Sequence, residues 1–460
     1  MRTSKYIIFG ISNIFLLLLM LPGIGSQIGR NTLSYGLGLS SLLLLIYGIY
    51  HYKLKPLSLL RVGSIKAIIL IPFLILIHAI LVFYFQGDIV EPIKLALSIL
   101  LLLLMLIASL SLFYLIDRAG QREFNFTLTY IYYALILIAV AAFFGLLDFG
   151  RTGKAVGFAS ETSQFVLVFS PFIFWKLCRT SNPISRCWII ISLFYSSLLF
   201  QSMLLSCIAI IASFITLKIN KLPVVFFAMF IVFHLHGMSI SYFESSGIKS
   251  PFLSKDEDAA SKYYRDRLPL LNSGHGFDVS SHNLIDIPRG FLHALVKNSY
   301  NTTLLAPISG WERAILNVKD SWGLGFGFNQ FGTKGRWGEA SLQSYKVTKQ
   351  SGPGFVICLR SGSLLGAKMV GEFGFIGIFF ILIYLKFSLT RLLEFRRYCM
   401  CLSQDSSSKN IFYIACVLCF SFSLFLRSPG YFSPESFLFM VSAFGLIMNG
   451  KSVSTSPAYQ

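Results

Sequence analysis

The sequence predicts an all-α polytopic membrane protein of about twelve transmembrane helices, with one large periplasmic loop that contains short helices. Of the 460 residues, 55% are hydrophobic and only 13% are charged, whereas about a quarter of the residues in a soluble domain are charged. Apolar runs of membrane-crossing length recur along most of the chain. Because a backbone inside a bilayer must satisfy its own hydrogen bonds, these runs are expected to be helices.

The expected spans cover residues 6–25, 33–50, 65–85, 93–116, 127–148, 163–177, 187–200, 203–217, 222–240, 369–387, 411–426 and 436–449. The first follows a basic N-terminus and has no A-x-A cleavage pattern, which favours an uncleaved span over a signal peptide. These spans divide the chain into three parts. Residues 1–240 hold transmembrane helices one to nine, residues 241–368 form the large periplasmic loop, and residues 369–460 hold helices ten to twelve and a cytoplasmic tail.

The seventh and eighth spans are short, and we expect a tight turn between them at Gln201 and Ser202. One long tilted helix over 187–217 is the alternative, and it would reverse the sidedness of everything downstream. Charge counting favours the turn. With a cytoplasmic N-terminus, the cytoplasmic segments hold 19 Lys and Arg, against five in the short external connectors. This asymmetry follows the positive-inside rule and predicts an inner-membrane protein whose N-terminus is cytoplasmic.

The loop 241–368 carries aromatic residues throughout, which argues against disorder. Short helices are expected around 286–298 and 311–322. The net charge of +19 lies mostly in connectors and accompanies no nucleic-acid-binding motif, so no nucleic acid partner is predicted. Only Cys358 of the eight cysteines lies in this loop, which makes a disulfide framework unexpected.

Ionisable residues gather in segments that this topology places outside the cytoplasm. In the connector before the sixth span, Arg151 and Lys154 precede Glu161. Charged groups at a membrane boundary are candidates for function. The alternative is a hydrated connector in which Ser160 and Glu161 cap the next helix.

Two further groups lie in the large loop. His282 is a candidate proton acceptor, and Arg289 follows it on an expected helix, where its guanidinium could bind phosphate. No second ligand stands at metal spacing from His282, so no metal is predicted. Arg313 follows Glu312 and precedes a Gly-x-Gly-x-Gly run at 323–327, which lacks the context of a nucleotide-binding loop.

The last two groups flank the tenth and twelfth spans. Arg360 precedes Glu372, which lies one turn into the tenth span and could pair with an arginine or act in catalysis. The spacing of Gly374 and Gly377 favours close helix packing. A short external turn runs from Arg427 through Tyr431 to Glu435, where such charged and aromatic residues are expected to meet partners.

This external set of arginines suits a diphosphate, because guanidinium groups bind phosphate bidentately and do not titrate. A sugar linked to a lipid diphosphate carries its own driving force. Its leaving group needs charge stabilisation and its acceptor hydroxyl needs a base. No cofactor is predicted.

With these residues in place, the chain resembles the Wzy-type O-antigen and exopolysaccharide polymerases, and more distantly the O-antigen ligases. The likeness rests on the span count, the late external loop, and Gly157-Phe-Ala-Ser-Glu161-Thr-Ser163. It extends to Glu312-Arg313 before the glycine run, Gly371-Glu372-Phe-Gly374-Phe-Ile-Gly377, and the Arg427–Tyr431 turn. Thr162 stands where the family element has proline.

The resemblance implies inverting, metal-independent glycosyl transfer on the periplasmic face, which polymerises undecaprenyl-diphosphate-linked repeat units into O-antigen. Arg289, Arg313, Arg360 and Arg427 would hold diphosphates, and Glu161 or His282 would accept the hydroxyl proton. Arg151, Lys154, Glu372 and Tyr431 complete the expected substrate-binding set. Membrane lipids and a chain-length regulator protein are candidate partners. The alternatives are an O-antigen ligase that transfers glycan to lipid A core, and a transporter or flippase.

Overall fold

The computed structural model describes residues 32–52, 64–87, 91–144, 162–200, 202–245, 302–332, 338, 340–344, 363–401, 407–428 and 430–453. Within these ranges the regular secondary structure is entirely helical, which confirms the expected all-α class. Six of the predicted site residues, Arg151, Lys154, Glu161, His282, Arg289 and Arg360, lie outside the described residues, as do the expected first span and the expected helix at 286–298.

The helices are α2 (Thr32–Tyr52), α4 (Ser64–Gln86), α5 (Pro92–Arg118), α6 (Gln121–Phe143), α7 (Thr162–Arg179), α8 (Pro183–Leu199), α9 (Met203–Thr216), α10 (Leu222–Ser245), α13 (Thr302–Asp320), α15 (Leu365–Cys401), α16 (Ser408–Phe425) and α17 (Pro434–Val453), with a 3-10 turn η1 (Ile219–Lys221). Each expected span from the second to the twelfth overlaps one of these helices.

Three boundaries differ from expectation by six residues or more. Helix α6 begins at Gln121 rather than near residue 127, because the Glu123 carboxylate accepts a hydrogen bond from the Gly120 amide (3.0 Å) and caps the earlier start. Helix α13 begins at Thr302, nine residues before the expected start at 311. Helix α15 continues to Cys401, well past the expected end at 387.

Four of the described helices are long and apolar enough to cross a membrane: α5, α6, residues 365–400 of α15, and α16. Other apolar helices, such as α8 and α9, are shorter. Large apolar side chains stand exposed along α4 and α15, among them Phe73, Phe83, Phe379 and Leu382. A soluble protein rarely exposes such continuous apolar faces. The chain is therefore a membrane protein.

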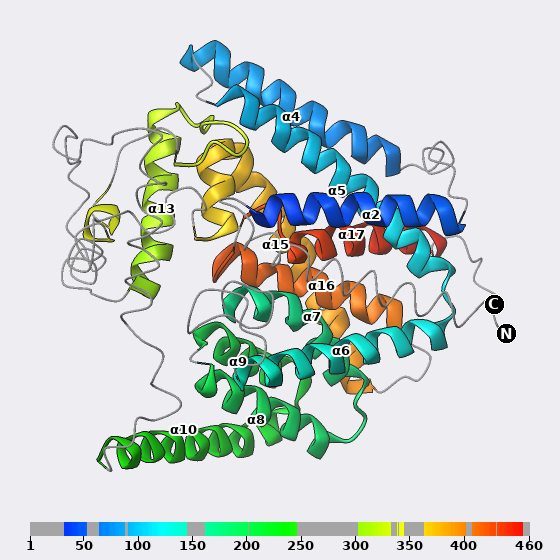
Figure 1. Cartoon of the computed structure of the whole chain (residues 1–460), viewed down its shortest axis with the longest axis vertical. Coiled ribbons are helices and arrows are strands. Elements are labelled where there is room, and N and C mark those ends of the chain that lie inside the picture. Colours follow the sequence, from blue (N-terminus) through cyan, green and yellow to red (C-terminus); the bar gives the residue numbers. More distant parts are fainter. Residues whose placement is uncertain are drawn as a thin grey trace.

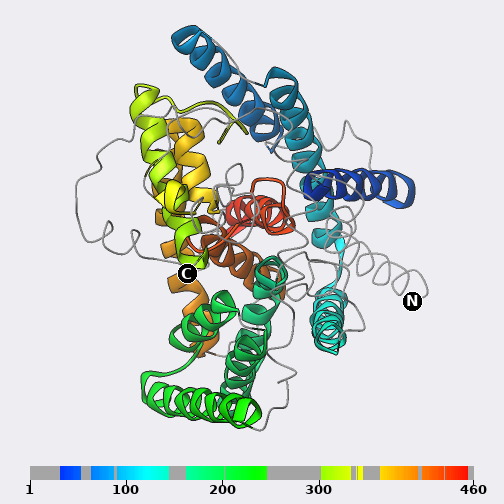
Figure 2. The same cartoon turned by 60° about the vertical axis from the view of Figure 1, so that its left-hand side comes forward.

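Helices α16 and α17 lie in the middle of the molecule in both views (Figures 1 and 2). Helix α17 packs between α16 and α5, and α7 packs on the other side of α16. Helices α4 and α5 lie at the top of Figure 1 and α8 to α10 at the bottom, while α13 stands upright across one end. The core is aromatic, with Phe124, Phe172, Phe412 and Tyr413 fully buried around α16.

Helices α8 and α9 form a tight antiparallel hairpin. Between them the Ser202 hydroxyl accepts a hydrogen bond from the Leu205 amide (3.4 Å) and caps α9. The hydroxyls of Ser197 and Ser206 meet across the hairpin at 2.7 Å. The predicted pair of short helices is therefore confirmed, since α8 ends at Leu199 and α9 begins at Met203, and a single long helix is wrong.

Arg186 joins three helix ends at the far end of this hairpin. The residue is 6% exposed, and its guanidinium donates to the carbonyls of Thr180 (2.6 Å), Thr216 (3.1 Å) and Cys399 (2.9 Å). These carbonyls end α7, α9 and α15, where helix dipoles leave partial negative charge. One cation thus neutralises three converging helix termini.

Replacing Arg186 with methionine should lower the free energy of unfolding by about 3 kcal/mol or more, because buried carbonyls would lose charged donors. Arg179→Met is the matched control, since Arg179 is exposed on α7 and should cost less than about 0.5 kcal/mol. Thermal unfolding of the purified protein in detergent measures both, and equal midpoints for the two variants would contradict the role given to Arg186.

Candidate functional site

Helix α15 is broken at Gly374, whose φ of 58° and ψ of −132° are not helical. Such a backbone conformation is open to glycine and strained for other residues. A Cβ on Gly374 would overlap the carbonyl of Gly323, and one on Gly377 would overlap the carbonyl of Met369 across the break. The expectation that these two glycines pack one helix closely against another is therefore wrong. Both glycines instead allow the backbone of α15 to break at Gly374.

A glycine loop, residues 321–332, replaces the hydrogen bonds that the break removes. The amides of Phe326 and Gly327 donate to the carbonyls of Gly371 (3.2 Å) and Glu372 (2.9 Å). In return the Phe375 amide donates to the Gly323 carbonyl (2.9 Å). The break thus leaves these backbone groups paired, as buried polar groups require.

The glycine run at 323–327 now has a structural explanation. Gly323, Gly325 and Gly327 all have positive φ, between 78° and 94°. A Cβ on Gly325 would overlap the backbone of Glu372, and one on Gly323 would overlap the Phe375 ring. Gly325 thus allows the loop backbone to touch the backbone of α15, and Gly323 makes room for the Phe375 ring.

Helix α4 holds the same loop from its other side. The His78 side chain bonds to the Leu324 carbonyl through Nε2 (2.8 Å), and Gln86 donates to the Gly325 carbonyl (2.9 Å). His78 also lies against the Phe373 ring, with centroids 5.0 Å apart. These contacts give His78 a structural role, because it joins α4 to the glycine loop.

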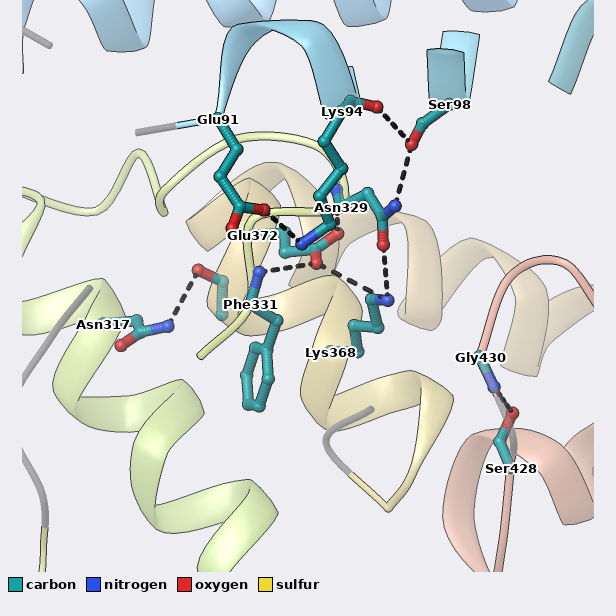
Figure 3. Close-up of polar contacts among 11 residues, drawn as sticks. Glu91, Lys94, Ser98, Asn317, Asn329, Phe331, Lys368, Glu372, Ser428 and Gly430 are labelled. Atoms are coloured by element: carbon teal, nitrogen blue, oxygen red, sulfur yellow. Dashed lines mark hydrogen bonds and ion pairs between the residues drawn. The ribbon is translucent and has the colours of Figure 1, made fainter. Parts of the chain in front are cut away.

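The Glu372 carboxylate is fully buried and binds the end of the glycine loop (Figure 3). Its Oε2 accepts from the Asn329 amide (2.8 Å) and its Oε1 from the Phe331 amide (2.9 Å). The Lys368 ammonium lies one turn earlier, 3.9 Å from Oε1. Two amides and a cation compensate the buried negative charge.

A polar chain continues from Lys368 to α5 (Figure 3). Lys368 donates to the Asn329 side chain (2.9 Å), which donates to the Ser98 hydroxyl (2.7 Å). Ser98 in turn donates to the carbonyl of Lys94 (2.6 Å), and the Lys94 ammonium pairs with Glu91 at 2.7 Å. The start of α15, the glycine loop and the start of α5 therefore form one connected network.

Arg313 and Glu312 on α13 also support this region. Arg313 is 3% exposed, and its guanidinium stacks 5.2 Å from the centre of the Phe331 ring. The Glu312 carboxylate accepts from the amides of Ala340 (3.0 Å) and Ser341 (3.1 Å). Burial raises the pKa of Glu312, and the two amides partly offset that rise.

The turn between α16 and α17 meets the start of α15. Arg427 donates to the Ser363 hydroxyl (3.2 Å), and the Ser428 amide donates to the Ser363 carbonyl (2.8 Å). The Tyr431 ring lies 4.9 Å from the Lys368 ammonium. Burial raises the pKa of Tyr431 well above its ordinary value, and the nearby Glu372 carboxylate adds to the rise. Tyr431 is therefore a neutral hydroxyl at physiological pH.

The four predicted site residues that the structure describes, Arg313, Glu372, Arg427 and Tyr431, gather around the first turns of α15. Sequence reasoning missed Lys368, Asn329 and Ser98. Lys368 could have been found from its position four residues before Glu372, a spacing that pairs side chains on a helix. No local pattern indicates the contacts of Asn329 and Ser98, which come from distant parts of the chain.

In the described part of the chain, no three histidine, cysteine or carboxylate side chains gather where they could hold a metal ion. Comparison with known proteins adds no relative, because no protein-family model, curated protein or solved structure matches the chain.

Gly374→Ala should destabilise the protein by more than about 4 kcal/mol, because strain and an overlap with the Gly323 carbonyl add together. Gly87→Ala is the matched control, since Gly87 also has positive φ (73°) but no atom within 4 Å of a new Cβ. That control should lose only about 1–2 kcal/mol. Thermal unfolding measures the stability lost by each variant. If Gly374→Ala and Gly87→Ala lost similar amounts, the glycine loop would not contact α15 closely at Gly374.

Glu372→Gln should cost about 3–5 kcal/mol, because the amide leaves Lys368 uncompensated and turns an NH₂ group toward a backbone amide. Hydrogen exchange should quicken at the amides of Asn329 and Phe331. Glu312→Gln makes the matched comparison, since it should quicken exchange at Ala340 and Ser341 instead. If both variants accelerated the same amides, the two carboxylates would not anchor separate segments.

Proposed function

We propose that the chain is a membrane glycosyltransferase of the Wzy type. In this proposal it polymerises undecaprenyl-diphosphate-linked repeat units by inverting, metal-independent transfer on the periplasmic face of the inner membrane. The growing glycan on its lipid diphosphate is the donor, and one lipid-linked repeat unit is the acceptor.

The observation that carries the proposal is the convergence at the start of α15. Arg313, Glu372, Arg427 and Tyr431 were singled out from three separate sequence segments, and they share one polar assembly. A set of cations and a neutral tyrosine hydroxyl at a membrane boundary suits an anionic lipid headgroup.

The contacts also support the proposed twelve-span orientation. The end of α4, the start of α5 and the start of α15, all predicted to be periplasmic, meet at the glycine loop. Groups predicted to be cytoplasmic meet elsewhere, where Arg186 binds Cys399 and Lys409 binds the Asp117 carbonyl. A reversed second half would mix these two sets.

The exposure of the cations supports a division of roles among them. Arg313 and Lys368 are nearly inaccessible. The Arg313 guanidinium stacks on the Phe331 ring, and the Lys368 ammonium contacts Glu372 and Asn329. Lys94 and Arg427 are partly exposed at the same end. In this proposal, Lys94 and Arg427 contact the diphosphate, while Arg313 and Lys368 position the surface beneath it.

A transporter is the second candidate, because broken helices are typical of transporter binding sites. The break in α15 favours it at first sight. In transporters the freed backbone groups coordinate the ion or substrate, however. Here the glycine loop pairs with the carbonyls of Gly371 and Glu372 and with the amide of Phe375, so these three groups are not open to a ligand.

The test is incubation of the purified protein with lipid-linked repeat units. A ladder of lengthening products is expected. Product only in the presence of lipid A core would indicate a ligase, and absence of any product would contradict a transferase.

Arg427→Ala should slow chain extension by about 10²-fold or more, since an exposed diphosphate contact contributes charge stabilisation. Arg427→Lys should recover part of the rate, because it keeps the charge and loses the planar fork. Arg179→Ala, at the other end of the bundle, is the matched control and should leave the rate unchanged. An unaffected ladder with Arg427→Ala would remove Arg427 from the site.

A further inference from the structure

Helix α15 is longer than a membrane span. Its 37 residues extend about 55 Å at 1.5 Å per residue, whereas the hydrocarbon core of a bilayer is about 30 Å thick. The helix begins at the glycine loop and ends beside α7 and α9, because its Cys399 carbonyl shares the Arg186 guanidinium with the carbonyls that end those two helices. Figure 2 shows this course as a gold-to-orange ribbon. The last turns of α15 therefore extend beyond the hydrocarbon core.

One face of α15 is exposed along its whole length after the break. Between Phe375 and Ile383 every exposed side chain is apolar, as on a lipid-facing surface. From the next turn onward the exposed side chains are cations and leucines with one threonine: Lys386, Leu389, Thr390, Leu393, Arg396 and Arg397. Their spacing of three and four residues keeps them on one face of the helix. The lipid-facing surface thus continues and becomes basic.

Two leucines distinguish this basic surface from a solvated one. Leu389 and Leu393 lie one helical turn apart and are 61% and 63% exposed. Leucines between cations suit a membrane interface, where apolar side chains enter the acyl boundary and cations reach the headgroups. Side chains on a helix also point back toward its N-terminus, which directs Arg396 and Arg397 toward the bilayer.

The opposite face of α15 holds this segment in place. Phe395 and Cys399 are buried, and the Phe395 ring lies 6.1 Å from the Phe174 ring of α7. The Cys399 carbonyl accepts from Arg186. The exposed cations therefore stand on a fixed helix, so little conformational entropy is lost when they bind a ligand.

The charges on this part of the bundle are almost all positive. On α7, α8, α9 and the part of α15 after Gly377, the one acidic side chain is Glu394, which pairs with Arg391 at 2.6 Å. Within the described residues, no hydrogen bond or ion pair engages the side chains of Lys386, Arg396 or Arg397. These three cations are open to an anionic ligand.

Exposed cations from two other helices lie at the same end. Arg179 ends α7, and Lys218 follows the end of α9. Each lies within two residues of a carbonyl that Arg186 binds, as Arg397 does on α15. Three helices thus present cations together, and the surface that complements them is anionic.

We propose that the basic stripe, the exposed face of α15 from Lys386 to Arg397, binds the anionic phospholipid headgroups of the leaflet at this end of the bundle. Arg396 and Arg397 donate to headgroup phosphates, and Leu389 and Leu393 lie against the acyl chains. Such anchors set the depth and tilt of a span. Because the basic stripe lies at the opposite end of α15 from the glycine loop, the proposal does not depend on glycosyl transfer.

The test is a titration of the full-length protein in detergent with phosphatidylglycerol or phosphatidylcholine, in which native mass spectrometry measures the Kd of the first lipid bound. The wild type should bind phosphatidylglycerol more tightly, and the preference should shrink as salt rises, because exposed charges are screened. The double variant Arg396→Gln/Arg397→Gln should weaken phosphatidylglycerol binding by about fivefold or more, since one cation at an anionic surface contributes about that factor.

Two variants serve as controls. Arg396→Lys/Arg397→Lys keeps both charges and should keep most of the preference. Lys319→Gln removes an exposed cation of α13, at the glycine-loop end, and should bind both lipids as the wild type does. All variants should unfold at the wild-type temperature, because the substituted side chains are exposed.

Three results would overturn the proposal. The first is equal affinity of the wild type for the two lipids. The second is a preference for phosphatidylglycerol that survives in Arg396→Gln/Arg397→Gln, which would leave the basic stripe to solvent or to a protein partner. The third is a preference that Lys319→Gln abolishes, which would place the lipid at the other end of the bundle.

Discussion

The exchange of backbone hydrogen bonds between the broken helix α15 and the glycine loop is the constraint on which this end of the molecule depends. A helix broken within a membrane protein exposes amides and carbonyls that have no water to bind. The glycine loop supplies the missing partners, with the Gly323 carbonyl and the amides of Phe326 and Gly327 standing in for helical ones. Neither element is satisfied without the other.

That exchange explains why so many distant residues meet here. Because the loop is fixed to α15, its other faces become attachment points. Helix α4 reaches it through His78 and Gln86, and α5 reaches it through Ser98. Arg313 of α13 stacks on the loop's Phe331. The glycine loop thereby connects four helices at one end of the bundle: α4, α5, α13 and α15.

The sequence predicted the helices well and their interactions less well. Apolar length located the helices, since the hydrophobic period of a span needs no partner to be recognised. The start of α13 was missed because Pro307 and Gly310 are poor helix formers, and packing against α15 overrides them. The break at Gly374 was missed for a related reason. Closely spaced glycines are compatible both with tight helix packing and with a backbone of positive φ. Which of the two occurs depends on the glycine loop that lies against α15, and that loop comes from a distant part of the sequence.

The buried charges were recognised as important, but their roles depend on what surrounds them. Sequence reasoning treated Arg313, Glu372 and Glu435 alike, as ionisable groups near a membrane face. The structure separates them by their partners. Glu372 holds two amides and Arg313 lies on an aromatic ring, so each is compensated within the protein. The Glu435 carboxylate is buried at the start of α17, beside the Ser433 hydroxyl. A compensated charge gains little from a new ligand, because binding would break existing contacts, whereas an uncompensated one gains the most. The compensated charges at this end of the bundle therefore form its rigid frame.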